Sequence, residues 1–124
     1  MVPGHDDESV GAMFKGVKEA DLNLALSESL RIHFAENTHF EVIAARTPGG
    51  YTKPFADIFT NQQKEITAFR KYVQYYTRLF ARKDIITPKT SVLHATARPE
   101  NANKLYGINW WANYNNIDLV LHIH

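Results

Sequence analysis

The segment that most limits the fold of this chain is its last one, residues 117–124. It reads Ile-Asp-Leu-Val-Leu-His-Ile-His and is apolar almost throughout. A strand that is exposed on one face would alternate apolar and polar residues, whereas a strand buried on both faces need not. The segment therefore predicts a central strand of a sheet.

The first half of the chain alternates in type, as an α/β protein does. Residues 2–5 have the pattern of the end of a strand that enters a tight turn, and residues 6–16 form a polar loop with two glycines. Residues 18–37 have the spacing of a helix. Its predicted buried face is Leu22, Ala25, Leu26, Ser29 and Leu30.

The second half continues the alternation. Residues 40–45 are rich in β-branched and aromatic side chains and predict a strand, which ends at a turn signal over residues 46–50. A long helix is expected over residues 57–83, a short strand over residues 91–95 and a further helix over residues 100–115. The apolar side of the long helix is predicted to consist of Ile58, Ile66, Phe69, Val73, Tyr76 and Phe80.

Composition excludes several classes of protein. A length of 124 residues is that of about one domain, and its apolar fraction of 44% is ordinary for a folded protein. The net charge of +1 gives no electrostatic reason to bind nucleic acid or an anionic membrane. The absence of cysteine excludes disulfides and thiolate metal sites. No apolar run approaches the ~20 residues that span a bilayer.

Three residues suggest a metal site. His5 follows Pro3-Gly4, Glu19 begins the first predicted helix, and His124 ends the last predicted strand. Two imidazoles and one carboxylate are a ligand set of catalytic zinc. Each residue also has a simpler interpretation: His5 as a loop residue, Glu19 as a partner of the helix dipole, and His124 as one of a packed pair with His122, which points to the same side of the strand.

Other residues give weaker signals. His33, His39 and His94 have no convincing ligand spacing and are expected at the surface. Basic and aromatic residues mix over residues 70–83, a pattern found in proteins that bind single-stranded nucleic acid. With almost no excess positive charge in the chain, an amphipathic helix with solvated cations is the better interpretation.

Taken in order, the motifs resemble the zinc-dependent N-acetylmuramoyl-L-alanine amidases of the amidase-3 type, which cleave peptidoglycan. That family has a strand that enters Pro-Gly-His, a loop with Gly-Ala, a glutamate at a helix start with Asn-Leu-Ala soon after, a strand that ends in Thr-Arg, and Ala-Asn before Asp-Leu-x-x-Ser-Ile-His. The matching residues here are Pro3-Gly4-His5, Gly11-Ala12, Glu19, Asn23-Leu24-Ala25, Ala45-Arg46, Ala112-Asn113 and the segment from Asp118 to His124.

The resemblance implies a function and a site. The expected reaction is zinc-dependent hydrolysis of the amide between N-acetylmuramic acid and L-alanine, with Zn²⁺ held by His5, Glu19 and His124. The expected partner is peptidoglycan or a muropeptide, and the expected location is the cell envelope or the exterior. The alternatives are a non-catalytic zinc- or cell-wall-binding α/β module, and an α/β domain whose histidines are incidental.

The resemblance also has departures. His122 stands where the family has serine, Ala45 stands where it has threonine, and residues 50–99 match none of its motifs. The family's catalytic glutamate lies downstream of the last histidine, so no catalytic residue is assigned within the chain. Residues 1–124 are therefore expected to be part of an amidase domain that lacks most of its first strand and its last segment. The implied fold is the phosphorylase/hydrolase-like amidase fold, an α/β fold with a three-layer-like mixed sheet and flanking helices, expected here to be incomplete.

Overall fold

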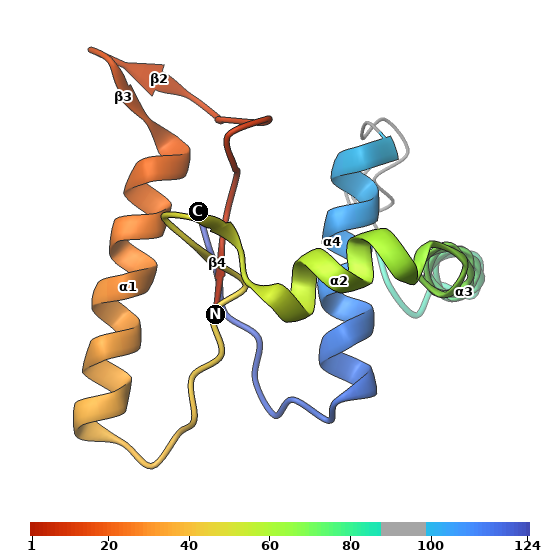
Figure 1. The fold of residues 1–124 in the computed structure, drawn as a ribbon. Helices are drawn as coiled ribbons and strands as arrows, with labels where there is room; N and C mark the ends of the chain where they lie inside the picture. The colour runs from red at the N-terminus through yellow and green to blue at the C-terminus, as the bar shows by residue number, and fades with distance from the viewer. Residues whose placement is uncertain (88–98) are drawn as a thin grey trace. The chain divides into compact units, whose positions relative to one another are not determined.

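The computed structural model describes residues 1–87 and 99–124, which form a mixed α/β structure (Figure 1). They divide into two compact units: Met1–Ala56 together with Asn116–His124, and Asp57–Asn115. The described residues include no helix that is long and apolar enough to cross a membrane. The α/β class predicted from the sequence is confirmed at this general level.

The first unit is organised around a short parallel pair of strands. β1 (Val2–Pro3) pairs with β6 (His122–Ile123), so that Val2 lies opposite His122. The amide of Gly4 extends the pairing by donating to the carbonyl of Ile123 at 2.8 Å. On its other side β1 meets a second segment, because the Ala45 amide donates to the Met1 carbonyl at 2.9 Å. The central strand is therefore β1.

The predicted long central strand at residues 117–124 is wrong. Only His122–Ile123 is a strand, and it lies beside β1 with its residues exposed or half-buried. The residues of β1 are both buried. The apolar composition of the last segment had indicated burial on both faces, but the pairing leaves it on one side of β1 alone.

Helix α1 (Glu19–Asn37) has the extent that the sequence predicts, but its predicted buried face is wrong. Leu22 and Leu26 are 60% and 51% exposed, whereas Ala20, Asn23 and Ser27 are buried. A hydrogen bond explains this difference. Asn23 Nδ2 donates to the Gly4 carbonyl at 3.2 Å, so the face of the helix that carries Asn23 is turned toward β1. Small side chains on that face let the helix approach the strand.

Two short hairpins complete the first unit. β2 (Met13–Phe14) and β3 (Val17–Lys18) pair antiparallel. β2 lies within the predicted loop over residues 6–16, and β3 ends at Lys18, where the helix was predicted to begin. β4 (Arg46–Thr47) and β5 (Gly50–Tyr51) form the second hairpin around the predicted turn. The strand predicted at residues 40–45 is wrong as assigned: no residue of this segment is in a strand, although Ala45 bonds to Met1, and β4 begins at Arg46.

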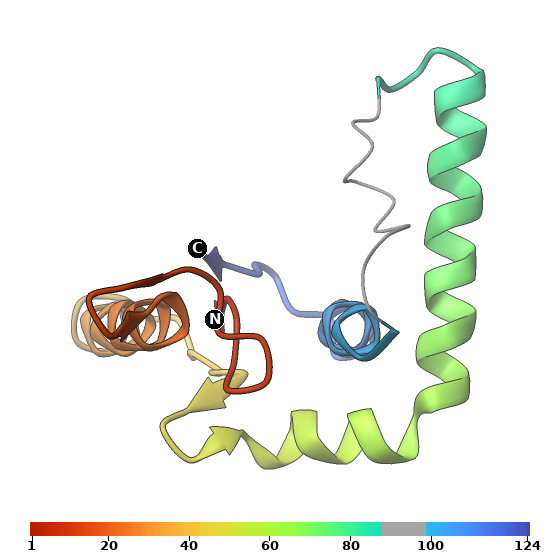
Figure 2. The same cartoon turned by 90° about the horizontal axis from the view of Figure 1, so that it is seen from above.

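Helix α2 (Lys53–Asn61) begins in the first unit and ends in the second, where α3 (Gln63–Arg82) follows. A single helix over residues 57–83 was predicted and is wrong: Gln62 has φ −116° and ψ 32°, so the chain changes direction there (Figure 2). Neither glycine nor proline marks this break in the sequence. Helix α4 (Pro99–Tyr114) matches its prediction closely.

The core of the second unit is small and apolar. Ile66 and Ala102 are each 1% exposed and pack with Tyr106, and Phe69 and Val73 cover them. The expected apolar side of α3 is only partly buried, because Tyr76 and Phe80 are exposed. The predicted strand at residues 91–95 lies outside the described residues.

Candidate metal centre

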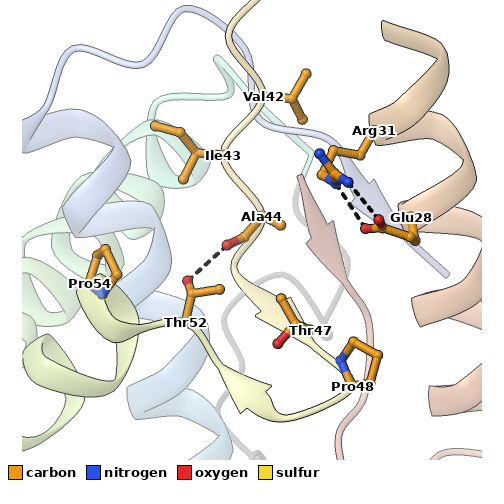
Figure 3. A pocket seen from close by; sticks show the side chains of 9 residues that line it. All are labelled: Glu28, Arg31, Val42, Ile43, Ala44, Thr47, Pro48, Thr52 and Pro54. Atoms are coloured by element: carbon orange, nitrogen blue, oxygen red, sulfur yellow. Dashed lines mark hydrogen bonds and ion pairs between the residues drawn. The ribbon is translucent and has the colours of Figure 1, made fainter. Parts of the chain in front are cut away.

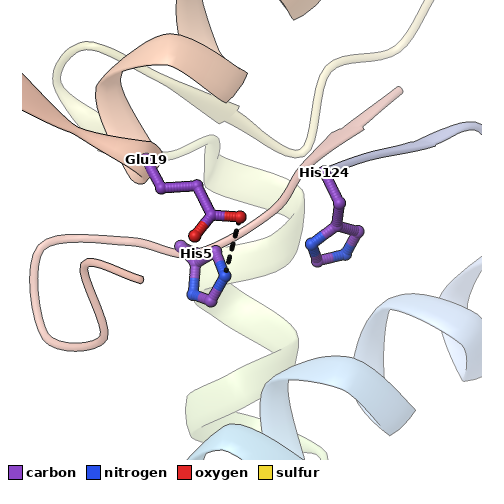
Figure 4. Close-up of side chains that lie close together, drawn as sticks. All are labelled: His5, Glu19 and His124. Carbon is purple, nitrogen blue, oxygen red and sulfur yellow. Dashed lines mark ion pairs between the residues drawn. The ribbon is translucent and has the colours of Figure 1, made fainter. Parts of the chain in front are cut away.

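The structure brings together the three residues that the sequence marked as metal ligands. His5, Glu19 and His124 each offer a ligand atom, and these atoms all lie within 4.8 Å of one another (Figure 4). All three belong to the first unit. His5 follows β1, His124 follows β6, and Glu19 begins α1, so the site lies where two parallel strands end beside the start of a helix. Sites in open α/β sheets are common at this edge.

His5 is held in a defined orientation by the loop that follows β1. Its backbone has φ 61°, in the left-handed region that non-glycine residues rarely adopt. Its ring Nδ1 lies 3.1 Å from the Ser9 carbonyl. A carbonyl only accepts hydrogen bonds, so Nδ1 is the donor. In the neutral ring the lone pair is then on Nε2, the nitrogen that faces Glu19.

Glu19 has one anchored oxygen and one that faces His5. Oε2 accepts a hydrogen bond from the Ala12 amide at 2.9 Å, and the Glu19 amide donates in return to the Ala12 carbonyl at 2.9 Å. Oε1 lies 3.5 Å from His5 Nε2. Two acceptors that face each other need a cation between them or a proton on the ring, so the arrangement suits a metal ion as well as an ion pair.

His124 supplies the third corner of the cluster. Its ring is 5.7 Å from the ring of His5, centre to centre, and nearly perpendicular to it at 86°. The neighbouring His122 is not part of the group of ligand atoms. Partial desolvation, followed by the proximity of His124, lowers the pKa of His122 below its ordinary value, so this ring stays neutral to lower pH.

Two glycines let the backbone approach the site closely. A Cβ on Gly4 would lie 2.5 Å from the ring of His124 and 2.7 Å from the Ile123 carbonyl oxygen. A Cβ on Gly11 would lie 2.5 Å from Glu19 Oε2 and 2.8 Å from His5 Cδ2, and Gly11 also has φ +73°. Any larger residue at either position would displace one of the candidate ligands.

The donor set suits a zinc ion, and one of its spacings is close to that of zinc ligands. Zinc binds imidazole nitrogen and carboxylate oxygen at about 2.0–2.2 Å, which places tetrahedral ligand atoms about 3.3 Å apart. The 3.5 Å between His5 Nε2 and Glu19 Oε1 is close to this value. His124 is exposed, so its side chain has room to turn toward the other two. The three residues could therefore hold a metal ion.

Two buried polar residues that support the site were not recognised as such from the sequence. Asn23 holds the Gly4 carbonyl, immediately before His5. Arg46 is 5% exposed, and its Nη2 donates to the Ala20 carbonyl at 3.0 Å, in the helical turn that carries Glu19. Both residues lie in the motifs quoted above, so their place in those motifs was the sequence feature that could have indicated a supporting role.

The remaining histidines lie where the sequence predicted, as far as they are described. His33 and His39 are exposed, and His33 is hydrogen-bonded to Asn37 one turn later in α1. His94 lies outside the described residues.

The first unit also has a hollow of about 510 Å³ that contains none of the three candidate ligands (Figure 3). Its lining includes the apolar side chains Val42, Ile43 and Pro54. The two charged residues at the hollow, Arg31 and Glu28, form an exposed ion pair at 2.6 Å. Thr47 and Thr52 also line the hollow, and the Thr52 hydroxyl donates to the Ala44 carbonyl at 2.9 Å.

Comparisons with protein-family models, with curated proteins and with solved structures give no match to this chain. The case for a function therefore rests on the residues themselves.

Proposed function

We propose that the chain is the zinc-binding part of an N-acetylmuramoyl-L-alanine amidase of the amidase-3 type, with Zn²⁺ held by His5, Glu19 and His124. One observation carries the proposal: three residues selected from sequence motifs far apart in the chain have ligand atoms within 4.8 Å of one another. Neither the spacing of the motifs nor the residue types alone would require this.

The supporting contacts also come from the motifs that carry the resemblance. Ala12, of the Gly-Ala motif, holds Glu19 through its amide. Asn23, of the Asn-Leu-Ala motif, holds Gly4, and Arg46, at the expected strand end, holds the carbonyl of Ala20. In this proposal the amidase motifs are the parts of a single ligand cradle, and the α/β structure that holds them is of the amidase type.

The chemistry suits hydrolysis of an amide. A zinc ion with two imidazole ligands and one carboxylate ligand supplies Lewis-acid chemistry and leaves room for substrate. Glu19 contributes the negative charge of the ligand set, with one oxygen anchored by the Ala12 amide. His5 presents Nε2 because Nδ1 is held by the Ser9 carbonyl. The proton transfers would need a glutamate of the kind that the family has downstream of its last histidine.

The first test is zinc binding by residues 1–124. We expect about one Zn²⁺ per chain, measured by metal analysis after dialysis and by competition with a chromogenic chelator. His5→Ala and Glu19→Ala should each lower the affinity by more than the about 10–100-fold that loss of a hydrogen-bond partner behind a ligand costs. His33→Ala is the matched control, since His33 is exposed on α1. Full zinc affinity in both ligand variants would refute the site.

The second test is catalytic and uses the full-length gene product. It should release stem peptides from purified muropeptides, and His5→Ala should abolish the release while His33→Ala does not. A second candidate, a zinc- or cell-wall-binding module without catalysis, is favoured by the lack of an assigned general base in the described residues. Zinc binding without hydrolysis would support that module instead.

A further inference from the structure

Behind His5 lies a chain of hydrogen bonds that ends in the second hairpin of the first unit. The hydroxyl of Tyr51 donates to Asp6 Oδ2 at 3.0 Å. Asp6 Oδ1 accepts from the Ser9 amide at 2.8 Å, and the Ser9 carbonyl accepts from His5 Nδ1 at 3.1 Å. Tyr51 thus acts on His5 from a position 45 residues away from Asp6 in the chain.

Asp6 is the centre of this chain of bonds. It is 6% exposed, and a buried carboxylate costs free energy unless it is well hydrogen-bonded. Besides Ser9 and Tyr51, the amide of Glu8 donates to it at 3.1 Å. Burial, followed by the negative charge of Asp6, raises the pKa of the Tyr51 phenol, so the hydroxyl stays protonated and remains a donor.

The loop between Asp6 and Ser9 needs this support. His5 has the left-handed φ of 61°, a conformation that persists only where surrounding contacts impose it. Two backbone hydrogen bonds close the loop: Asp6 N to Ser9 O at 3.1 Å and Ser9 N to Asp6 O at 3.2 Å. Together with the carboxylate of Asp6, they determine where the Ser9 carbonyl meets the imidazole.

We propose that Asp6 and Tyr51 are positioning residues of the metal centre, which together fix the His5 ring with Nδ1–H on Ser9 and Nε2 toward Glu19. This inference rests on the proposed metal function. Hydrogen bonds behind a ligating imidazole set its tautomer and orientation and raise its affinity for metal. Here the bond is to a backbone carbonyl, so the side chains of Asp6 and Tyr51 act by holding that carbonyl in place.

The test is Tyr51→Phe, which removes only the hydroxyl, with Tyr75→Phe as a matched control because Tyr75 is 61% exposed. Tyr51→Phe should lower zinc affinity by about 10-fold, at the lower end of the range for partners behind a ligand. Asp6→Ala should lower it further. If Asp6→Ala does not fold, Tyr51→Phe still decides the question, since it retains the ring.

A second measurement separates this proposal from the zinc assignment. Long-range nitrogen–proton NMR spectra of metal-free protein with ¹⁵N-labelled histidine report the tautomer of each neutral ring. His5 should be the Nδ1–H tautomer in the parent protein and in Tyr75→Phe, and a mixture of tautomers in Tyr51→Phe. If the parent protein binds no zinc but His5 changes in this way, the positioning stands and the metal function fails. An unchanged His5 tautomer in Tyr51→Phe overturns the positioning, whether or not zinc binds.

Discussion

Different kinds of internal contact stabilise each of the two units of this protein. In the first unit, buried polar groups connect the elements: Asn23 to Gly4, Arg46 to Ala20, and Tyr51 to Asp6. In the second, apolar and aromatic side chains pack around Ile66 and Tyr106. A packed core tolerates changes that conserve volume, whereas a polar network fails when one partner is removed. The difference predicts that stability and metal binding respond separately to substitution in the two units.

The largest expected effect is a difference in zinc affinity between substitutions of two histidines in the first unit. His124→Ala should abolish tight zinc binding, because it removes a ligand, whereas His122→Ala should retain most of the affinity, because His122 lies outside the cluster of ligand atoms. Isothermal titration with Zn²⁺ compares the two. The reverse ranking would mean that the last strand contributes the other histidine.

The next effect is on the packed core of the second unit. Ile66→Ala should lower the free energy of unfolding by about 2–5 kcal/mol, because Ile66 is fully buried and its loss leaves a cavity. Denaturant unfolding measures this loss. The zinc affinity of the folded fraction should not change, and a parallel fall in affinity would show that the two units are energetically coupled.

In the first unit, by contrast, stability and metal binding should change together. Asn23→Ala leaves the Gly4 carbonyl without this partner and should cost about 1–3 kcal/mol of unfolding free energy. Gly4 immediately precedes His5, so zinc affinity should also fall. Denaturant unfolding and chelator competition on the same preparation check both. Lowered stability with full affinity would indicate that the ligand cradle does not depend on this contact.

The smallest effect tests which face of α1 is buried. Leu22→Ala should change the free energy of unfolding by less than about 0.5 kcal/mol, because Leu22 is 60% exposed. If Leu22 were buried, as the sequence pattern predicts, the same substitution would remove a core leucine and lower the free energy of unfolding by about 2–5 kcal/mol. Thermal unfolding distinguishes these outcomes, with Leu26→Ala as a second variant on the same face.

The helices of this protein could be predicted from the sequence better than its sheet could. The extents of α1 and α4 follow from spacing and from their first-turn residues, which are local properties. The buried face of α1 does not, because it is chosen by the hydrogen bond from Asn23 to a strand distant in sequence. Each strand in the described residues is two residues long, which is too short for a hydrophobic periodicity to indicate it.

The three candidate ligands could be proposed from the sequence, but the hydrogen bonds that hold them in place could not. His5, Glu19 and His124 could be chosen because their residue types and motif positions suit zinc. The bond between Tyr51 and Asp6 could not be foreseen, because neither residue belongs to a motif and the contact depends on how the second hairpin lies against the loop. The sequence also gives no signal for the break between α2 and α3 at Gln62, since Gln is an ordinary helix former.

The pairing of β1 with β6 has a consequence for folding. These strands come from opposite ends of the described sequence, with Val2 beside His122, so the pairing closes a loop that includes almost every other residue. Closing a long loop is entropically costly, and contacts of such wide sequence separation form slowly. His5 and His124 follow directly on these strands. A metal ion held between them would act as a clip across the closed loop, and its removal should slow refolding as well as lower the stability of the folded chain.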